Sequence, residues 1–167
     1  MEPKIAMSLK ALSLALAMCG ASLWVQAAGT HTHPDTPIGA PGYSDKVTRT
    51  ITIDMQDNMR FVPATLVVKQ GETIRLLVRN KGAMTHELVM GNSQDLLAHA
   101  KAMQQAPQMQ HRDPNSLSLA PGRQGELLWH FTRAMTVDFA CLQPGHFESG
   151  MRGKIEVAKG HSDAHAH

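Results

Sequence analysis

Short runs of alternating apolar and polar residues, separated by turn residues, recur from residue 48 to residue 158. In the first run, Ile51, Ile53 and Met55 share one face of an extended chain, and polar side chains occupy the other face. This period is typical of half-buried β-strands. Further runs of this kind lie at residues 66–68, 74–78, 87–90, 117–119, 127–131, 137–141 and 155–157. The pattern predicts an all-β fold, an antiparallel Greek-key β-sandwich of seven or eight strands.

Residues 93–103 follow a different period. Ser93 and Asp95 have the composition of a helix N-cap and an acidic first turn. Leu96, Ala100 and Met103 then recur at helical spacing. The segment predicts one helix of about three turns, inserted between the strands.

The first 27 residues have the composition of a secretory signal peptide. Lys4 and Lys10 precede an apolar stretch over residues 11–25, and small residues follow at the positions that a signal peptidase reads. Because the stretch is short and interrupted by polar residues, a retained membrane anchor is disfavoured. We therefore expect residues 1–27 to be removed and the protein to be exported to a periplasm, with no membrane span.

The remaining chain divides by composition into three segments. Residues 28–46 are rich in Pro, Gly, Thr and Asp without an apolar period, which predicts a disordered linker. The sandwich domain is predicted at residues 47–158, and a flexible tail at residues 159–167. The histidines of the two ends either bind a metal ion weakly or are only solvated; they are His31, His33, His161, His165 and His167.

The position of signal cleavage affects the N-terminal histidines. Cleavage after Ala27 is the expectation, because Val25 and Ala27 fit the small-residue pattern better. Cleavage after Ala28 would instead begin the mature chain with Gly29-Thr30-His31, whose nitrogen atoms suit a square-planar Cu(II) site.

The composition excludes one class of function and favours another. A formal net charge of +2 falls short of the basic surface that a nucleic-acid-binding domain needs, so no nucleic-acid partner is expected. Ten histidines and eleven methionines stand beside only two cysteines. Imidazole, thioether and thiolate groups are the ligands that select copper. Since Cys19 leaves with the signal peptide, Cys141 is the remaining thiol, and in an oxidising compartment it needs burial, another chain or a metal.

The residues around Cys141 favour a metal. Cys141, His146 and Met151 follow a Cys-x4-His-x4-Met spacing between the last two predicted strands, and His86 begins an earlier strand. Two imidazoles and a thiolate with a weak axial thioether form the type of site that holds copper for electron transfer. The sequence therefore predicts a copper site with the ligands His86, Cys141, His146 and Met151.

The segment 141–154, CLQPGHFESGMRGK, closely resembles the ligand loop of cupredoxins, and most closely that of rusticyanin, auracyanin and the periplasmic copper-tolerance cupredoxins. The segment 80–88, NKGAMTHEL, resembles the part of these proteins that carries the first ligand. The resemblance covers roughly residues 48–158 and implies one type 1 copper per chain. One residue departs from the pattern: Glu87 stands where several relatives have an Asn or Ser whose side chain ties the two ligand loops together.

Two roles follow from this resemblance, a one-electron carrier and a copper-tolerance factor that sequesters or oxidises copper, and the sequence leaves both open. We expect no enzyme, because multicopper enzymes need further paired histidines whereas Cys141 is flanked by Ala140 and Leu142. The resemblance implies that the His146 ring reaches the surface through an apolar patch with Leu142 and Pro144. Partners would be redox or copper-handling proteins bound transiently, and the protein itself a monomer.

A second group of sulfur and imidazole side chains lies on and after the predicted helix: His99, Met103, Met109 and His111. A second copper site is one interpretation. Packing is favoured, because Met103 shares the apolar helix face with Leu96 and Ala100. Of the remaining methionines, Met84 is expected nearest the copper, and His130 is expected at the surface of its strand.

Overall fold

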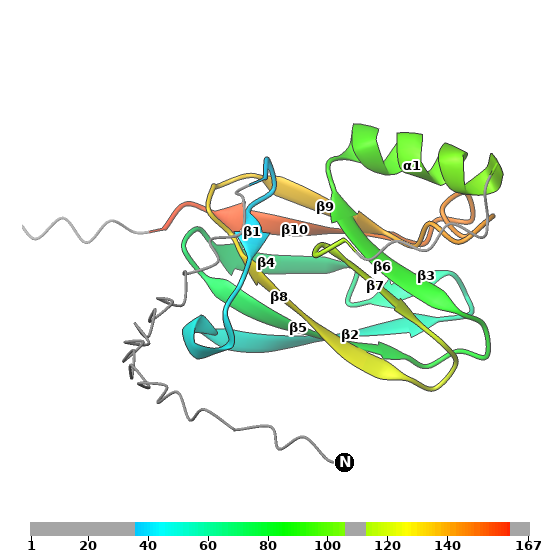
Figure 1. Ribbon diagram of the computed structural model, residues 1–167, viewed down its shortest axis with the longest axis horizontal. Coiled ribbons are helices and arrows are strands. Elements are labelled where there is room, and N and C mark those ends of the chain that lie inside the picture. The colour runs from blue at the N-terminus through cyan, green and yellow to red at the C-terminus, as the bar shows by residue number, and fades with distance from the viewer. Residues whose placement is uncertain (1–35, 106–112, 161–167) are drawn as a thin grey trace, which may run out of the picture. The chain divides into compact units, whose positions relative to one another are not determined.

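The structure is a computed structural model that describes residues 36–105 and 113–160 (Figure 1). Within these residues, ten strands pair into two five-stranded sheets, in the orders β1-β8-β5-β2-β3 and β4-β10-β9-β6-β7. The first sheet contains β1 (Ala40–Pro41), β2 (Arg49–Gln56), β3 (Arg60–Val62), β5 (Thr73–Asn80) and β8 (Gln124–His130). The second contains β4 (Thr65–Lys69), β6 (His86–Gly91), β7 (Ser116–Leu119), β9 (Thr136–Ala140) and β10 (Arg152–Ala158). The predicted all-β sandwich is confirmed, with more strands than the predicted seven or eight.

The core lies between the two sheets and is built by the alternating residues. On β5, Ile74, Leu76 and Val78 are fully buried, and the side chains between them are half-buried. The second sheet contributes Val137 and Phe139 of β9, also at most 1% exposed, to the same cluster. Because strands such as β4, β5 and β10 bury every second side chain, the period-2 pattern of the sequence is the pattern of the core.

Two strand pairings are parallel, where the sequence pattern predicted an antiparallel sandwich. β2 pairs with β5 in parallel, and β4 pairs with β10 in parallel. The chain leaves β2 through β3, crosses to the other sheet as β4, and returns as β5 beside β2. Alternation reveals that a segment is a strand, but it carries no information about the direction of the partner.

Residues 36–46 belong to the sandwich, so the predicted disorder of residues 28–46 is wrong for this part. Ile38 is 7% exposed, and its carbonyl oxygen accepts a hydrogen bond of 3.0 Å from Nε1 of Trp129. β1 pairs with β8, and a 3₁₀-helix covers Ser44–Lys46. A single apolar residue among Pro and Gly shows no period in the sequence. Ile38 is ordered instead by its contact with Trp129, a distant residue. Residues 28–35 lie outside the described residues, as do the predicted signal peptide and residues 161–167 of the tail.

The predicted helix is confirmed as α1 (Ser93–Gln105). Leu96, Ala100 and Met103 are buried against Val89 of β6 and Phe147, in a second cluster outside the main core. Figure 1 shows α1 lying along the sheet that contains β6 and β9, above the segment that precedes β10. In the described part of the chain, no helix is long and apolar enough to cross a membrane.

The burial of Met103 confirms its packing role. His99 is half-buried on α1, whereas Met109 and His111 lie outside the described residues. His130, expected at the surface, is half-buried, and its Nδ1 lies 3.1 Å from the hydroxyl oxygen of Thr73.

Candidate metal centre

The predicted ligands converge because the strands that carry them are neighbours. His86 begins β6, Cys141 follows the end of β9, and β6 pairs with β9 through Val89 and Ala140. One potential ligand atom from each of His86, Cys141 and His146 lies within 4.8 Å of the others. The two imidazole rings have centroids 5.0 Å apart. Residues 55 positions apart in the sequence are thereby brought into one cluster by sheet pairing.

The loop between β9 and β10 is closed by its own backbone. The N–H of Cys141 donates to the carbonyl of Met151 at 3.0 Å, and the N–H of Met151 donates to the carbonyl of His146 at 3.0 Å. Gly145 and Gly150 adopt φ of 83° and 92°, in the left-handed region that favours glycine. The four residues between successive predicted ligands therefore form a tight loop that is held by backbone hydrogen bonds.

Cys141 is fully buried, and its sulfur has two close polar neighbours. The backbone N–H of Glu87 donates to Sγ at 3.3 Å, and Nδ1 of His146 lies 3.3 Å from Sγ. Burial raises the pKa of the Cys141 thiol to about 11, and the negative charge of the nearby Glu87 carboxyl also acts to raise this pKa. Without a cation the thiol is therefore protonated at neutral pH, and a bound metal ion would displace that proton.

Glu87, which departs from the cupredoxin pattern, still ties the two ligand segments together, since its backbone N–H makes the contact with Cys141. Its side chain is 3% exposed.

His86 has the environment of a metal-binding imidazole. The side chain is fully buried, and its Nε2 lies 2.9 Å from Oδ1 of Asp57. Its Nδ1 is buried and has no hydrogen-bond partner within the described residues. Leaving a buried polar atom unsatisfied costs about 1–3 kcal/mol, so such an atom needs an explanation. A copper ion among two imidazoles and a thiol would supply it, and the residues present fit this metal.

His146 is the more accessible of the two histidines. Its side chain is half-buried, and burial lowers its pKa, assisted by the neighbouring His86. The imidazole is therefore neutral at physiological pH, with a lone pair available for a metal.

Asp57 was not predicted from the sequence. It lies in the turn between β2 and β3, where an Asp is ordinary and gives no signal of a metal site. Its pKa is lowered, first by the hydrogen bond from the backbone N–H of Ala83 and then by the one from His86.

Four further predicted residues are placed as follows. Met151 is fully buried in the same core cluster as Cys141, and its role as axial ligand stays a prediction. Met84 is 40% exposed on the segment before His86. The predicted surface patch is wrong for Leu142, which is 1% exposed because it packs in the cluster beneath α1, whereas Pro144 is exposed.

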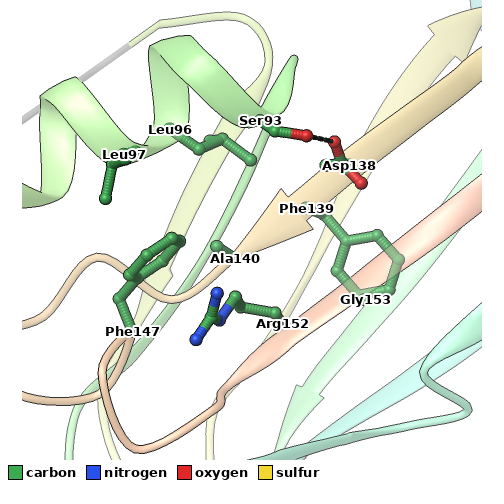
Figure 2. Close-up of a pocket in the computed structure, with 9 residues that line it drawn as sticks. All are labelled: Ser93, Leu96, Leu97, Asp138, Phe139, Ala140, Phe147, Arg152 and Gly153. Carbon is green, nitrogen blue, oxygen red and sulfur yellow. Dashed lines mark hydrogen bonds between the residues drawn. The ribbon is translucent and has the colours of Figure 1, made fainter.

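A cavity of about 270 Å³ lies outside the metal cluster, between α1 and the ligand loop (Figure 2). Leu96 and Leu97 of α1 line one side, and Phe147 and Arg152 line another. The guanidinium carbon of Arg152 lies 4.4 Å from the centroid of the Phe147 ring. None of the four predicted ligands lines this cavity.

Comparisons with known proteins agree with the chemistry of this cluster. The family of copper-binding proteins that includes plastocyanin and azurin matches residues 37–158. The copper-resistant cuproprotein CopI of Rubrivivax gelatinosus is 50% identical over 131 residues, which cover 78% of this chain and 79% of that protein. The protein of the same name from Pseudomonas aeruginosa is 32% identical over 148 residues, covering 71% of this chain and 81% of the relative. The structure of auracyanin B matches with a TM-score of 0.60 at 21% identity, over 72% of this chain and 96% of the other, and supports the fold.

Proposed function

Because this chain belongs to the plastocyanin/azurin family of copper-binding proteins, we propose that it is an exported copper-tolerance cupredoxin with one type 1 copper site. The proposed ligands are His86, Cys141, His146 and Met151. The observation that carries the proposal is the cluster of two imidazoles and a thiol within 4.8 Å, in which the buried Nδ1 of His86 has no hydrogen-bond partner among the described residues.

The donor set suits both oxidation states of copper. A bound copper ion would supply one-electron chemistry between Cu(I) and Cu(II). The chain contributes a soft thiolate from Cys141, which favours Cu(I), and imidazoles from His86 and His146, which bind both states. The ligand loop is held by backbone hydrogen bonds and the thiol by the N–H of Glu87, so these side chains have little freedom to move.

The tolerance role is supported by the relatives, two of which are named copper-resistant cuproproteins. It is also supported by the excess of methionine and histidine. We propose export to a periplasm on the basis of the N-terminal signal pattern, and a monomer that binds copper-handling or redox proteins transiently. We propose binding and redox chemistry rather than catalysis of a substrate reaction.

An electron carrier is the second candidate, favoured by the partial exposure of His146. Among the three clustered residues, His86 and Cys141 are fully buried, whereas His146 is half-buried. An imidazole that reaches from the metal toward the surface offers a route for an electron. Deletion of the gene separates the roles: loss of copper resistance without a respiratory defect favours tolerance, and the reverse favours a carrier.

The copper site is tested by visible and EPR spectroscopy of the mature protein after one equivalent of Cu(II). We expect an intense thiolate-to-copper band with narrow hyperfine splitting. Cys141→Ser and His86→Gln should abolish the band, whereas the matched control His130→Gln should keep it. A coloured Cys141→Ser protein would contradict the assignment. A colourless wild type with square-planar Cu(II) signals would place the copper in the histidine-rich ends.

A further inference from the structure

Asp57 contacts the first predicted ligand from a different part of the chain. It lies in the turn after β2, 29 residues before His86, and its Oδ1 is 2.9 Å from Nε2 of His86. Both of its oxygens have further donors: Oδ2 accepts the N–H of Ala83 at 2.7 Å, and Oδ1 accepts the N–H of Met84 at 3.3 Å. The carboxylate is therefore oriented by two backbone donors on the segment that leads into His86.

This contact decides which nitrogen of His86 carries the proton. A carboxylate whose oxygens accept hydrogen bonds from backbone N–H groups can only accept from the imidazole as well, so Nε2 is the protonated nitrogen. In a neutral imidazole the lone pair then lies on Nδ1, which is the buried nitrogen without a hydrogen-bond partner in the described part of the chain. The contact with Asp57 thus favours one tautomer and one orientation of the His86 ring.

The loop before His86 leaves space for the carboxylate of Asp57. A Cβ at Gly82 would lie 1.9 Å from Oδ1 of Asp57, so the close approach requires a glycine there. Asn80 holds the same loop, because its Oδ1 accepts the N–H of Gly82 at 2.9 Å and its Nδ2 donates to the carbonyl of Met84 at 2.7 Å. The glycine at position 82 and the hydrogen bonds of Asn80 therefore both keep the loop in the conformation that accommodates Asp57, and neither feature involves His86.

We propose that Asp57 is the positioning residue of the copper site, which holds His86 with Nδ1 directed at the metal and makes this imidazole a stronger donor to Cu(II). This proposal rests on the proposed copper site and names a residue that tunes the Cu(II) affinity and the reduction potential of that site. A carboxylate that accepts the distal N–H of a metal-binding histidine fixes the tautomer and raises the basicity of the ligand. Since Cu(II) depends on nitrogen donors more than Cu(I) does, the contact favours the oxidised state and lowers the reduction potential.

The first test uses the metal-free protein and needs no copper. Nitrogen-15 NMR of the apo protein, with His86 assigned by comparison with His86→Gln, reports which ring nitrogen is protonated. We expect the Nε2–H tautomer in the wild type. Asp57→Ala should give a mixture of tautomers, whereas the control Asp54→Asn, which removes a carboxylate of β2 that is paired with Arg79 of β5, should leave the wild-type tautomer. A wild-type His86 protonated on Nδ1 would overturn the proposal.

The second test uses the copper-loaded protein. Asp57→Asn removes the charge and places an amide N–H₂ against a backbone donor, and it serves alongside Asp57→Ala in case the alanine variant does not fold. We expect Cu(II) affinity in both variants to fall by about 10–100-fold, with a smaller loss for Cu(I) and hence a higher reduction potential. Asp57→Glu should restore part of the effect.

The outcomes separate the two proposals. If the wild type gives the thiolate band but the Asp57 variants match Asp54→Asn in potential and affinity, the positioning role is wrong and the copper site stands. If the wild type gives no thiolate band, the proposed function fails, and the tautomer in the apo protein still decides the role of Asp57.

Discussion

The backbone N–H of Glu87 donates a hydrogen bond of 3.3 Å to Sγ of Cys141, across 54 residues of sequence. The contact joins the start of β6 to the loop that follows β9. These two strands are neighbours in the same sheet. Because β6 and β9 are paired, the fold brings the backbone N–H of Glu87 to the thiol of Cys141. A donor aimed at the sulfur also favours the thiolate once a cation is bound, opposing the effect of burial.

Met151→Leu tests the predicted axial ligand. Leucine has a similar volume, so the substitution should cost less than about 1.5 kcal/mol of stability. We expect the thiolate band to remain and the reduction potential to rise, because a thioether donor to Cu(II) is lost. Voltammetry and the visible spectrum measure both. The control is Met90→Leu, since Met90 is also fully buried in the core. Equal potentials in the two variants would show that Met151 is not a ligand.

Copper should stabilise the folded protein. A ligand that binds only the native state adds about 2.7 kcal/mol when its free concentration is 100 times the dissociation constant. We therefore expect the melting temperature measured by circular dichroism to rise on adding copper and to fall again with a chelator. Cys141→Ser should show a much smaller rise. Coincident melting of apo and copper-loaded wild type would argue against the site.

A chain that begins at residue 47 should be less stable than one that begins at residue 36. The shorter chain lacks Ile38, whose burial contributes about 1.5–3 kcal/mol. It also leaves the buried Nε1 of Trp129 without the Ile38 carbonyl, at a cost of about 1–3 kcal/mol. Urea unfolding of the apo proteins measures the difference, with the full mature chain as the reference for the longer variant. Equal midpoints for the two truncated chains would show that residues 36–46 do not contribute to stability.

Glu72→Gln should destabilise the protein in a pH-dependent way. Two nitrogens of the Arg49 guanidinium donate to the Glu72 carboxylate, and this pairing lowers its pKa below the usual 4.5. A carboxyl whose pKa is depressed by folding adds stability above its unfolded pKa, and this is lost as the pH falls through its folded pKa. We expect a loss of about 0.5–1 kcal/mol at neutral pH, disappearing as the pH falls below 4.5.

Chemical denaturation as a function of pH measures this difference. Glu126→Gln is the control, because Glu126 is 54% exposed in its ion pair with Arg75 and should contribute less. A Glu72→Gln difference that persists unchanged in acid would assign the effect to packing.

Gly82→Ala should reproduce the effect of removing Asp57. The added Cβ would lie 1.9 Å from Oδ1 of Asp57, so the carboxylate must move away from His86. We expect a higher reduction potential and weaker Cu(II) binding than in the wild type. In the Asp57→Ala background the same substitution should add little, because the atom it displaces is already absent. Additive effects in the double variant would mean that Gly82 acts through another contact.

The proposed copper ligands could be predicted from the sequence because most of them lie close together along the chain. Cys141, His146 and Met151 lie within eleven residues, and their side-chain chemistry is specific to copper. The strands were recognisable for the same reason, since alternate residues of one segment face the core whatever its partner. β3 was missed because a strand of three residues with one buried side chain, Phe61, shows no period.

Chain segments far apart in the sequence supply the rest of the site and of the fold, and only their packing shows it. Asp57 reaches His86 across 29 residues, and Trp129 binds Ile38 across 91. The parallel partners of β2 and β4 likewise depend on how the chain crosses between the sheets. A local pattern reports residue chemistry and which face of a strand is buried. A local pattern does not show which distant group completes a hydrogen bond, because the packing of the whole domain determines that group.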